Sequence, residues 1–379
     1  MKAIIHGRII TEKGLLDDNV LLFEDKIFGI VPEKEIDRYK IERFIDAKER
    51  YVSPGFIDMH IHGAAGHDIM DGSEEGIRVI SENLVASGVT GFLATTATMD
   101  WNTIEKALDN IKKAMDKRYG SKVLGCHLEG PFISKKYPGA QNGLHIIRTD
   151  FSFLENYKDV IKMITTAPEL ENSQGFIRRC VEENILVSIG HSCATYDETL
   201  NAIKLGARSI THIFNAMTPL HHRNPGVVGA AMDDKDVNCE LIADNIHIHP
   251  AIQRILLKVK GTEKIVLITD SMRASGMEEG CYKVAGQTVI VKDNSARLEN
   301  GTLAGSILTM DRALKNFRDN TGVPIEEAVK TVTFNPARLL GIYDRTGSLE
   351  KGKDADIVIF NEEFNIAYTF VRGDQCYKE

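Results

Sequence analysis

The chain has 379 residues, of which 43% are hydrophobic and 26% are charged, and its formal net charge at pH 7 is −8. This composition is that of an ordinary globular protein with a sizeable apolar core. The excess of acidic side chains argues against a nucleic acid or an anionic membrane surface as the partner. No apolar run approaches the roughly 18 residues that a membrane-spanning helix needs.

The first residues, MKAIIHGRIITEKG, lack the continuous apolar stretch of a secretory signal peptide. The six cysteines are scattered along the chain without a CxxC pair. That pattern is typical of reduced, mostly buried thiols. We therefore expect a cytoplasmic protein.

Residues 1–52 predict short β-strands, because apolar and polar residues alternate between turns that contain glycine, as in KAIIHGRII. Residues 346–379 show the same pattern, as in DIVIFNEEFNIAYTFVRG. We expect the two ends of the chain to form one small β-sandwich domain. Residues 281–305 alternate similarly, and the sequence leaves open whether this β-rich insertion joins the sandwich or stays on the central domain.

The central segment, residues 53–345, alternates short apolar runs with amphipathic stretches. Helical patterns lie at 73–88, 102–117, 173–184 and 196–206. Eight apolar runs predict strands at 56–62, 91–97, 123–130, 161–169, 185–191, 209–216, 239–248 and 265–270. Continuous apolar strands are typical of a parallel sheet that is covered on both faces. Eight such units in series predict an α/β fold, a (β/α)8 TIM-type barrel that forms the catalytic domain.

Imidazoles and carboxylates recur at the C-terminal ends of these runs, where the active site of such a barrel lies. They are His60, His62, His127, Glu129, His191, His212, Asp244, His247 and Asp270. His60 and His62 leave one face of a strand about 6.6 Å apart along the backbone. This clustering predicts a metal centre. The alternative for His191 and His212 is a hydrogen-bonded structural histidine, and His127 is either a ligand or a group that supports one.

Mixed imidazole and carboxylate ligands suit Zn²⁺, Fe²⁺, Mn²⁺ or Co²⁺ better than Ca²⁺ or Mg²⁺. Such an ion lowers the pKa of a bound water to about 7. A nearby carboxylate can then take up the proton of the water and return it to a leaving group. Asp270, at the end of the eighth run, is the candidate for this role. The alternative is that Asp270 only caps the chain or binds the ion.

The blocks PGFIDMHIH, Asp270 and GSLEKGKDADIVIF resemble the amidohydrolase superfamily. The blocks HLEGPFI, GHSCATYDE, THIFNAMTPLHHRNPG, ADNIH, LITDSM and NGTLAGSILTM are similar, within it, to the N-acetylglucosamine-6-phosphate deacetylase family. Together they run from about residue 53 to residue 360. The resemblance implies hydrolysis of the N-acetyl amide of N-acetylglucosamine 6-phosphate to glucosamine 6-phosphate and acetate, in amino-sugar catabolism and recycling. It also implies a homodimer with one or two divalent ions per chain, zinc or iron foremost and manganese or cobalt as alternatives.

By this resemblance Glu129, His191 and His212 hold the principal ion, and Asp270 is the acid and base. His60 and His62 are available for a second ion. The implied substrate-binding residues are Ala140, Gln141, Asn215, Ala216, Arg223, Asp244, Asn245, Ile246, His247, Leu303, Ala304 and Gly305. We expect Arg223 and His247 to bind the phosphate, with Arg223 reaching it either within its own chain or across the dimer. Gln141 stands where some relatives have a histidine, which leaves its role open.

Two other functions stay open. One is another amidohydrolase-type hydrolase that cleaves cyclic amides or N-acyl groups. Several of those bridge two ions with a carboxylated lysine, and no lysine ends a strand in this layer. The other is a sugar-phosphate binding protein without catalysis, against which Asp270 and the three intact ligands argue.

Overall fold

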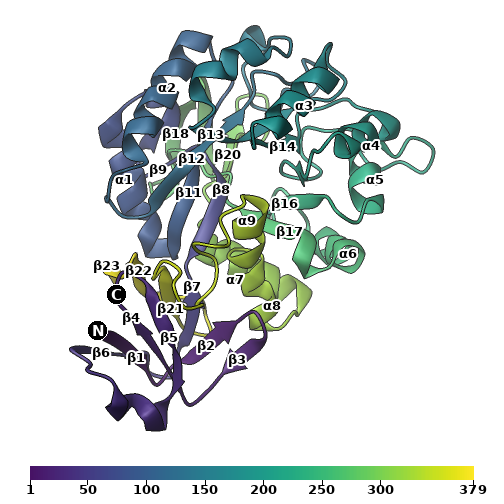
Figure 1. The fold of residues 1–379 in the computed structure, drawn as a ribbon. Coiled ribbons are helices and arrows are strands. Elements are labelled where there is room, and N and C mark those ends of the chain that lie inside the picture. Colours follow the sequence, from purple (N-terminus) through teal and green to yellow (C-terminus); the bar gives the residue numbers. More distant parts are fainter.

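The computed structural model describes residues 1–379, and its centre is an eight-stranded parallel barrel (Figure 1). The strands follow one another in chain order as β8 (Phe56–Ile61), β11 (Val89–Thr96), β12 (Lys122–Glu129), β13 (Ile161–Thr166), β14 (Leu186–Ile189), β15 (Ser209–Ile210), β16 (Asn238–Ile242) and β17 (Ile265–Ile268). The end of β17 closes on β8, because the backbone N–H of Asp270 donates to the carbonyl of His60 over 2.9 Å. The predicted (β/α)8 barrel is confirmed.

Helices cover the outside of the barrel (Figure 1). They are α1 (Glu74–Leu84), α2 (Trp101–Ala114), α3 (Ser173–Glu182), α4 (Tyr196–Lys204), α5 (Gly226–Asp233), α6 (Pro250–Lys260), α7 (Met310–Thr321), α8 (Ile325–Lys330) and α9 (Phe334–Leu339). In α2 the buried residues Ile104, Leu108 and Ile111 recur every three or four positions, which gives the helix one apolar face. The carboxylate of Asp100 begins that helix by accepting from the backbone N–H of Thr103. No helix in the chain is both long enough and apolar enough to cross a membrane.

The two ends of the chain build two further sheets below the barrel (Figure 1). One contains β1 (Lys2–Ile5), β4 (Asn19–Phe23), β5 (Ile27–Pro32) and β6 (Arg43–Asp46). The other contains β2 (Arg8–Thr11), β3 (Gly14–Leu16), β7 (Tyr51–Pro54), β21 (Ile357–Phe360), β22 (Ile366–Val371) and β23 (Asp374–Lys378). Within the second sheet β7 pairs with β2 on one side and with β21 on the other, so both termini meet there.

An apolar core fills the terminal domain. The rings of Phe23 and Phe370 meet edge to face with their centroids 5.4 Å apart, although the two residues come from opposite ends of the chain. Burying each such ring is worth about 1.5–3 kcal/mol. The division of the chain at residues 52 and 346 stays a prediction; β7 itself ends at Pro54, and a single residue separates it from β8.

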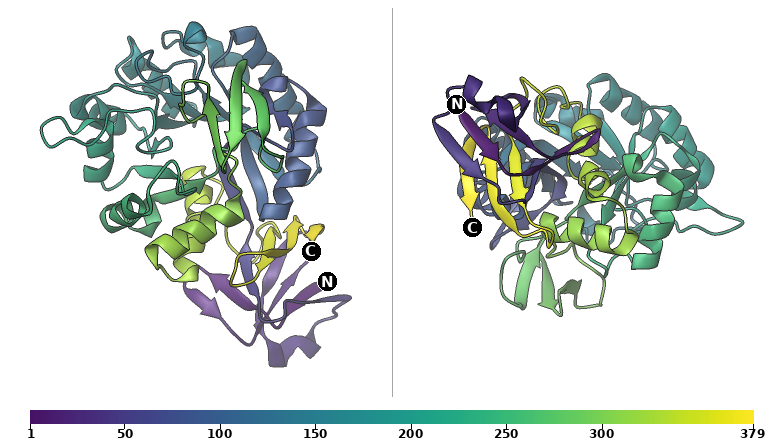
Figure 2. Two further views of the ribbon diagram at one scale, coloured as in Figure 1. Left: turned by 180° about the vertical axis from the view of Figure 1, so that it is seen from behind. Right: turned by 90° about the horizontal axis from the view of Figure 1, so that it is seen from below.

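Residues 280–298 form a separate sheet of β18 (Gly280–Val284), β19 (Gln287–Lys292) and β20 (Ser295–Leu298). The buried residues Val289, Val291 and Ala296 pack on Met272 at the barrel mouth. These strands therefore lie over the barrel, away from the terminal sheets (Figure 2). A short hairpin of β9 (Gly63–Ala64) and β10 (His67–Asp68) follows the first barrel strand.

Candidate active site

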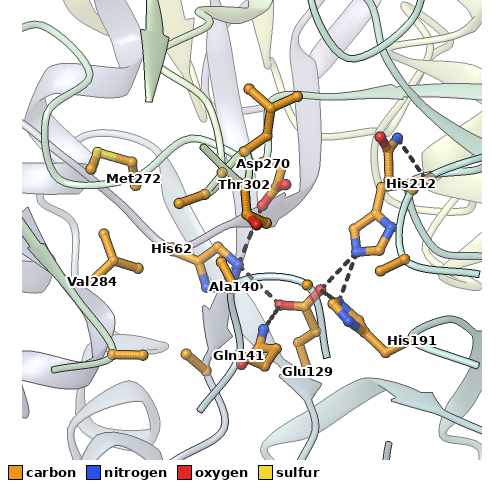
Figure 3. Close-up of a pocket in the computed structure, with 18 of the residues that line it drawn as sticks. His62, Glu129, Ala140, Gln141, His191, His212, Asp270, Met272, Val284 and Thr302 are labelled. Atoms are coloured by element: carbon orange, nitrogen blue, oxygen red, sulfur yellow. Dashed lines mark hydrogen bonds and ion pairs between the residues drawn. The ribbon is translucent and has the colours of Figure 1, made fainter. Parts of the chain in front are cut away.

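A cavity of about 390 Å³ opens at the C-terminal ends of the barrel strands (Figure 3). Most of the predicted site residues line it: His62, Glu129, Ala140, Gln141, His191, His212, Asn215, Ala216, His247, Asp270, Leu303, Ala304 and Gly305. His60 is fully buried in contact with this set. Arg223, Asp244, Asn245 and Ile246 do not line the cavity of a single chain.

Three of these side chains converge on one point. The Nε2 atoms of His191 and His212 each lie 3.1 Å from Oε1 of Glu129, and they lie 3.0 Å from each other. All three side chains are buried. Two donors at about 2.1 Å from one tetrahedral ion lie about 3.4 Å apart, so these spacings suit a shared ion. Nδ1 of His191 lies 3.1 Å from the carbonyl oxygen of Tyr137, an acceptor that leaves Nε2 free to bind a metal.

The backbone places these groups in an unusual way. His191, His212 and Asp270 each stand two residues after the end of a strand, β14, β15 and β17 respectively. Each has a left-handed backbone, with φ of 47°, 31° and 47°. This conformation costs a residue other than glycine of order 1–3 kcal/mol, and it persists only where the surroundings enforce it. A left-handed residue at each of these three strand ends thus helps to set the three side chains around one cavity.

A second group adjoins the first and shares Glu129 with it. Nε2 of His62 lies 3.1 Å from Oε2 of Glu129 and 3.3 Å from Oδ1 of Asp270. Nε2 of His60 lies 3.4 Å from Oε1 of Glu129 and 3.4 Å from Oδ1 of Asp270. Glu129 therefore faces His191 and His212 with one oxygen and His62 with the other, as the dashed lines in Figure 3 mark.

The charges in this cluster are strongly coupled. Burial would lower the pKa of His62, but Asp270 and Glu129 outweigh it and raise that pKa to about 10. Burial would likewise raise the pKa of Glu129, but His60 and the hydrogen bonds from His191 and His212 hold it well below its usual value. The buried carboxylates therefore need positive charge beside them.

The donor set fits a divalent ion. Glu129, His191 and His212 form one group whose ligand atoms all lie within 4.8 Å of one another, and His60, His62 and Glu129 form a second. Nε2 of His60 is buried without a hydrogen-bond partner. Imidazole and carboxylate ligands are those of zinc, iron, manganese and cobalt sites. His127, for which the sequence left a ligand or a supporting role open, belongs to neither group, and its Nε2 bonds Oγ1 of Thr165 over 2.7 Å.

The sequence model of the amidohydrolase family matches residues 51–376. The chain belongs to the amidohydrolase family. An N-acetylglucosamine-6-phosphate deacetylase of Bacillus subtilis (strain 168) is 39% identical to it, over 97% of this chain and 95% of that protein. An N-acetylgalactosamine-6-phosphate deacetylase of Escherichia coli O157:H7 is 36% identical, over 97% of each. The crystal structure of the N-acetylglucosamine-6-phosphate deacetylase of Pasteurella multocida superposes with a TM-score of 0.94, at 32% identity and full coverage of both chains.

In this amidohydrolase Gln141 contacts the shared carboxylate. Its Nε2 donates to Oε2 of Glu129 over 2.6 Å, and its Oε1 accepts from the backbone N–H of Thr98 over 2.6 Å. The amide is therefore oriented by the main chain, and its N–H group faces the predicted metal ligand. Ala140, just before it, accepts at its carbonyl from Nε2 of Gln287 on β19, which ties this loop to the sheet above the cavity.

Of the two predicted phosphate-binding residues of this amidohydrolase, His247 lies in the cavity and Arg223 lies outside it. His247 lines the cavity, and its Nδ1 lies 2.7 Å from Oδ2 of Asp244. Asp244 also accepts from the backbone N–H of His247 over 2.8 Å. Asn245 instead accepts from Gln253 on α6. Arg223 is exposed on the loop after β15, where its Nη1 lies 2.7 Å from Nε2 of His222, outside the cavity of its own chain. Their binding roles stay predictions.

Arg297 on β20 was not predicted, and it is the one lysine or arginine that lines the cavity. Its Nη1 donates to the carbonyl of Gly301 over 2.9 Å. In the sequence its charge suggests nothing more than a solvated hairpin. A signal nevertheless existed, because the turn after it leads back to Leu303, which pairs with it and belongs to a predicted substrate segment.

Proposed function

We propose that this chain hydrolyses the N-acetyl amide of N-acetylglucosamine 6-phosphate and releases glucosamine 6-phosphate and acetate. The observation that carries the proposal is the convergence of Glu129, His191, His212 and Asp270 in one cavity, in a chain similar over its whole length to deacetylases of amino-sugar phosphates. We further propose that it acts in the cytoplasm, in amino-sugar catabolism and recycling.

Glu129, His191 and His212 would hold the principal divalent ion, and His60 and His62 with Glu129 a second one. When bound, such an ion acidifies water and polarises a carbonyl oxygen, the two effects that amide hydrolysis at neutral pH requires. Zinc and iron are the proposed ions, with manganese and cobalt as alternatives, because all four accept imidazole and carboxylate ligands.

Asp270 is the proposed acid and base. Burial would raise its pKa, but the charge of His60 and the hydrogen bond from His62 outweigh burial and lower it. Asp270 is therefore an ionised acceptor at neutral pH. It takes a proton from the water whose oxygen attacks the amide carbon. It then gives that proton to the sugar nitrogen as the C–N bond breaks, so that the products are acetate and the free amine.

The rest of the cavity would bind the sugar phosphate. The segments Ala140–Gln141, Asn215–Ala216 and Leu303–Gly305 line it. His247 reaches the same space, held by Asp244. Arg223 does not line the cavity of its own chain, so we propose a homodimer in which the second subunit supplies it.

A second substrate is the 4-epimer, N-acetylgalactosamine 6-phosphate. The observation that favours it is the relative of that name, which is similar to this chain over almost its full length. Both epimers carry the same amide and the same phosphate, so the proposed chemistry at Asp270 is unchanged. Discrimination between them depends on contacts to one hydroxyl group.

The test is an acetate-release assay on both sugar phosphates, beside metal analysis of the purified protein. We expect acetate and a primary amine in equal amounts, and loss of activity on chelation that added metal restores. Binding of the sugar phosphate by metal-loaded protein without acetate release would instead support a non-catalytic binding protein. Ring opening of a cyclic amide, with no acetate release from either sugar phosphate, would support another type of amidohydrolase.

Subunit mixing tests the dimer. Chains with Arg223→Ala and chains with Asp270→Asn are each expected to be nearly inactive. A mixed dimer has one site with both side chains intact if Arg223 acts across the interface, so mixing should restore part of the activity. If heterodimers form but no activity is recovered, Arg223 acts within its own subunit.

A further inference from the structure

Glu240 is a carboxylate in the middle of a barrel strand. It lies on β16, between Cys239 and Leu241, and its exposed fraction is 0%. A buried carboxylate is costly unless charged or hydrogen-bonding partners face it. No step of the proposed reaction uses Glu240, so its presence needs another explanation.

Glu240 contacts two of the candidate metal ligands, His60 and His212. Its Oε2 lies 3.1 Å from Nδ1 of His60 and accepts from the backbone N–H of His212 over 3.3 Å. Its Oε1 has no hydrogen-bond partner. His60 is the one ionisable side chain within hydrogen-bonding distance of this carboxylate.

This contact fixes the orientation of the His60 ring and the nitrogen atom that faces the candidate metal site. A carboxylate accepts, so the ring carries a proton on Nδ1 and turns Nε2 toward Glu129 and Asp270, each 3.4 Å away. Nε2 itself has no hydrogen-bond partner. The ring of His127 packs against that of His60 at 82°, with centroids 4.5 Å apart, which limits rotation of the ring.

His60 differs in this respect from the neighbouring candidates. Nδ1 of His62 faces the carbonyl oxygen of Thr95 at 3.2 Å, and Nδ1 of His191 faces that of Tyr137 at 3.1 Å. A hydrogen bond to a carboxylate is stronger than one to a neutral carbonyl. It also makes the imidazole a better electron donor toward a metal.

We propose that Glu240 is a positioning residue for the second divalent ion, holding His60 so that Nε2 is aimed between Glu129 and Asp270. The inference rests on the proposed two-ion centre. The proposal predicts different effects on the two ions, because Glu240 bonds a side chain of the second group but only the backbone of His212 in the first.

The test is a Co²⁺ titration of the metal-free protein against a competing chelator, with ions per chain counted by mass spectrometry. Glu240→Ala should weaken the second ion about 10- to 100-fold and leave the first at its wild-type affinity. Glu240→Gln keeps an oxygen acceptor for His60 and should recover part of the loss. Thr90→Val is the matched control, because it removes a buried hydrogen bond to the carbonyl of Phe56 at the N-terminal end of the barrel strands and touches neither a candidate ligand nor His127.

Unchanged binding of the second ion in Glu240→Ala overturns the proposal, as does a wild-type chain that takes up a single Co²⁺ at saturation. Equal loss of both ions, together with a lower melting temperature of the metal-free protein, assigns Glu240 to the fold instead. These readouts are independent of turnover. Failure of the proposed deacetylation appears separately, as absence of acetate release by the loaded wild-type protein.

Discussion

Replacing Asp270 by asparagine removes the proposed proton acceptor while leaving its surroundings in place. The main chain there is fixed on both sides, because Asp270 donates to the carbonyl of His60 and accepts from the N–H of Ser306 over 2.7 Å. Its φ of 47° is left-handed, a conformation that asparagine adopts more readily than most residues. The side chain belongs to neither candidate ligand group. The substitution should therefore preserve the fold and the metal content.

The loss should fall on the chemical step. General acid and base catalysis is typically worth 10²–10⁴-fold, or about 2.7–5.4 kcal/mol of barrier. We expect kcat for N-acetylglucosamine 6-phosphate to fall at least about a hundredfold, measured as acetate release at matched metal content. Asp58→Asn is the control, because Asp58 is also a buried carboxylate of the barrel but does not line the cavity; it accepts from the hydroxyl of Thr269 and from the backbone N–H of His60. Near-normal kcat in metal-replete Asp270→Asn would refute the assignment.

The other predictions concern the ligands and the phosphate. His212→Ala should abolish retention of the principal ion, whereas the double variant His60→Ala/His62→Ala should keep about one ion per chain; loss of all metal from the double variant would reverse the ranking of the two sites. Arg223→Ala and Arg297→Ala, assayed on phosphorylated and unphosphorylated sugar, should separate the two arginines. Removing an arginine that binds the phosphate should cost several kcal/mol in kcat/KM on the phosphorylated sugar alone. Equal losses on both substrates identify an arginine with a structural role.

The barrel could be predicted from the sequence because each buried parallel strand reads as one apolar run, and most of these runs carry a histidine or a carboxylate near their C-terminal end. That regularity alone is enough to bring His191, His212 and Asp270 to one edge of the barrel. The placement of residues 280–298 could not be predicted. A hairpin with one buried face alternates in the same way on any surface, and only the packing of Val289 on Met272 decides its location.

Two functional candidates were missed for different physical reasons. The alternation of apolar and polar residues places Arg297 on the outer face of a hairpin, but it does not show whether that face meets solvent or the cavity. Glu240 carried a visible signal, since a carboxylate inside an apolar parallel strand is costly there. The structure was still needed to show its partner, His60, which lies 180 positions earlier in the chain.

The sharing of one sheet by both ends of the chain has a consequence during synthesis. The strand β7 leaves the ribosome early, but its partner β21 follows roughly 300 residues later. At about 5–20 residues per second, the edge of β7 waits about 15–60 s for that partner. During this interval the nascent chain presents an unpaired apolar edge, which is where chaperone binding or aggregation of a truncated chain should be detected.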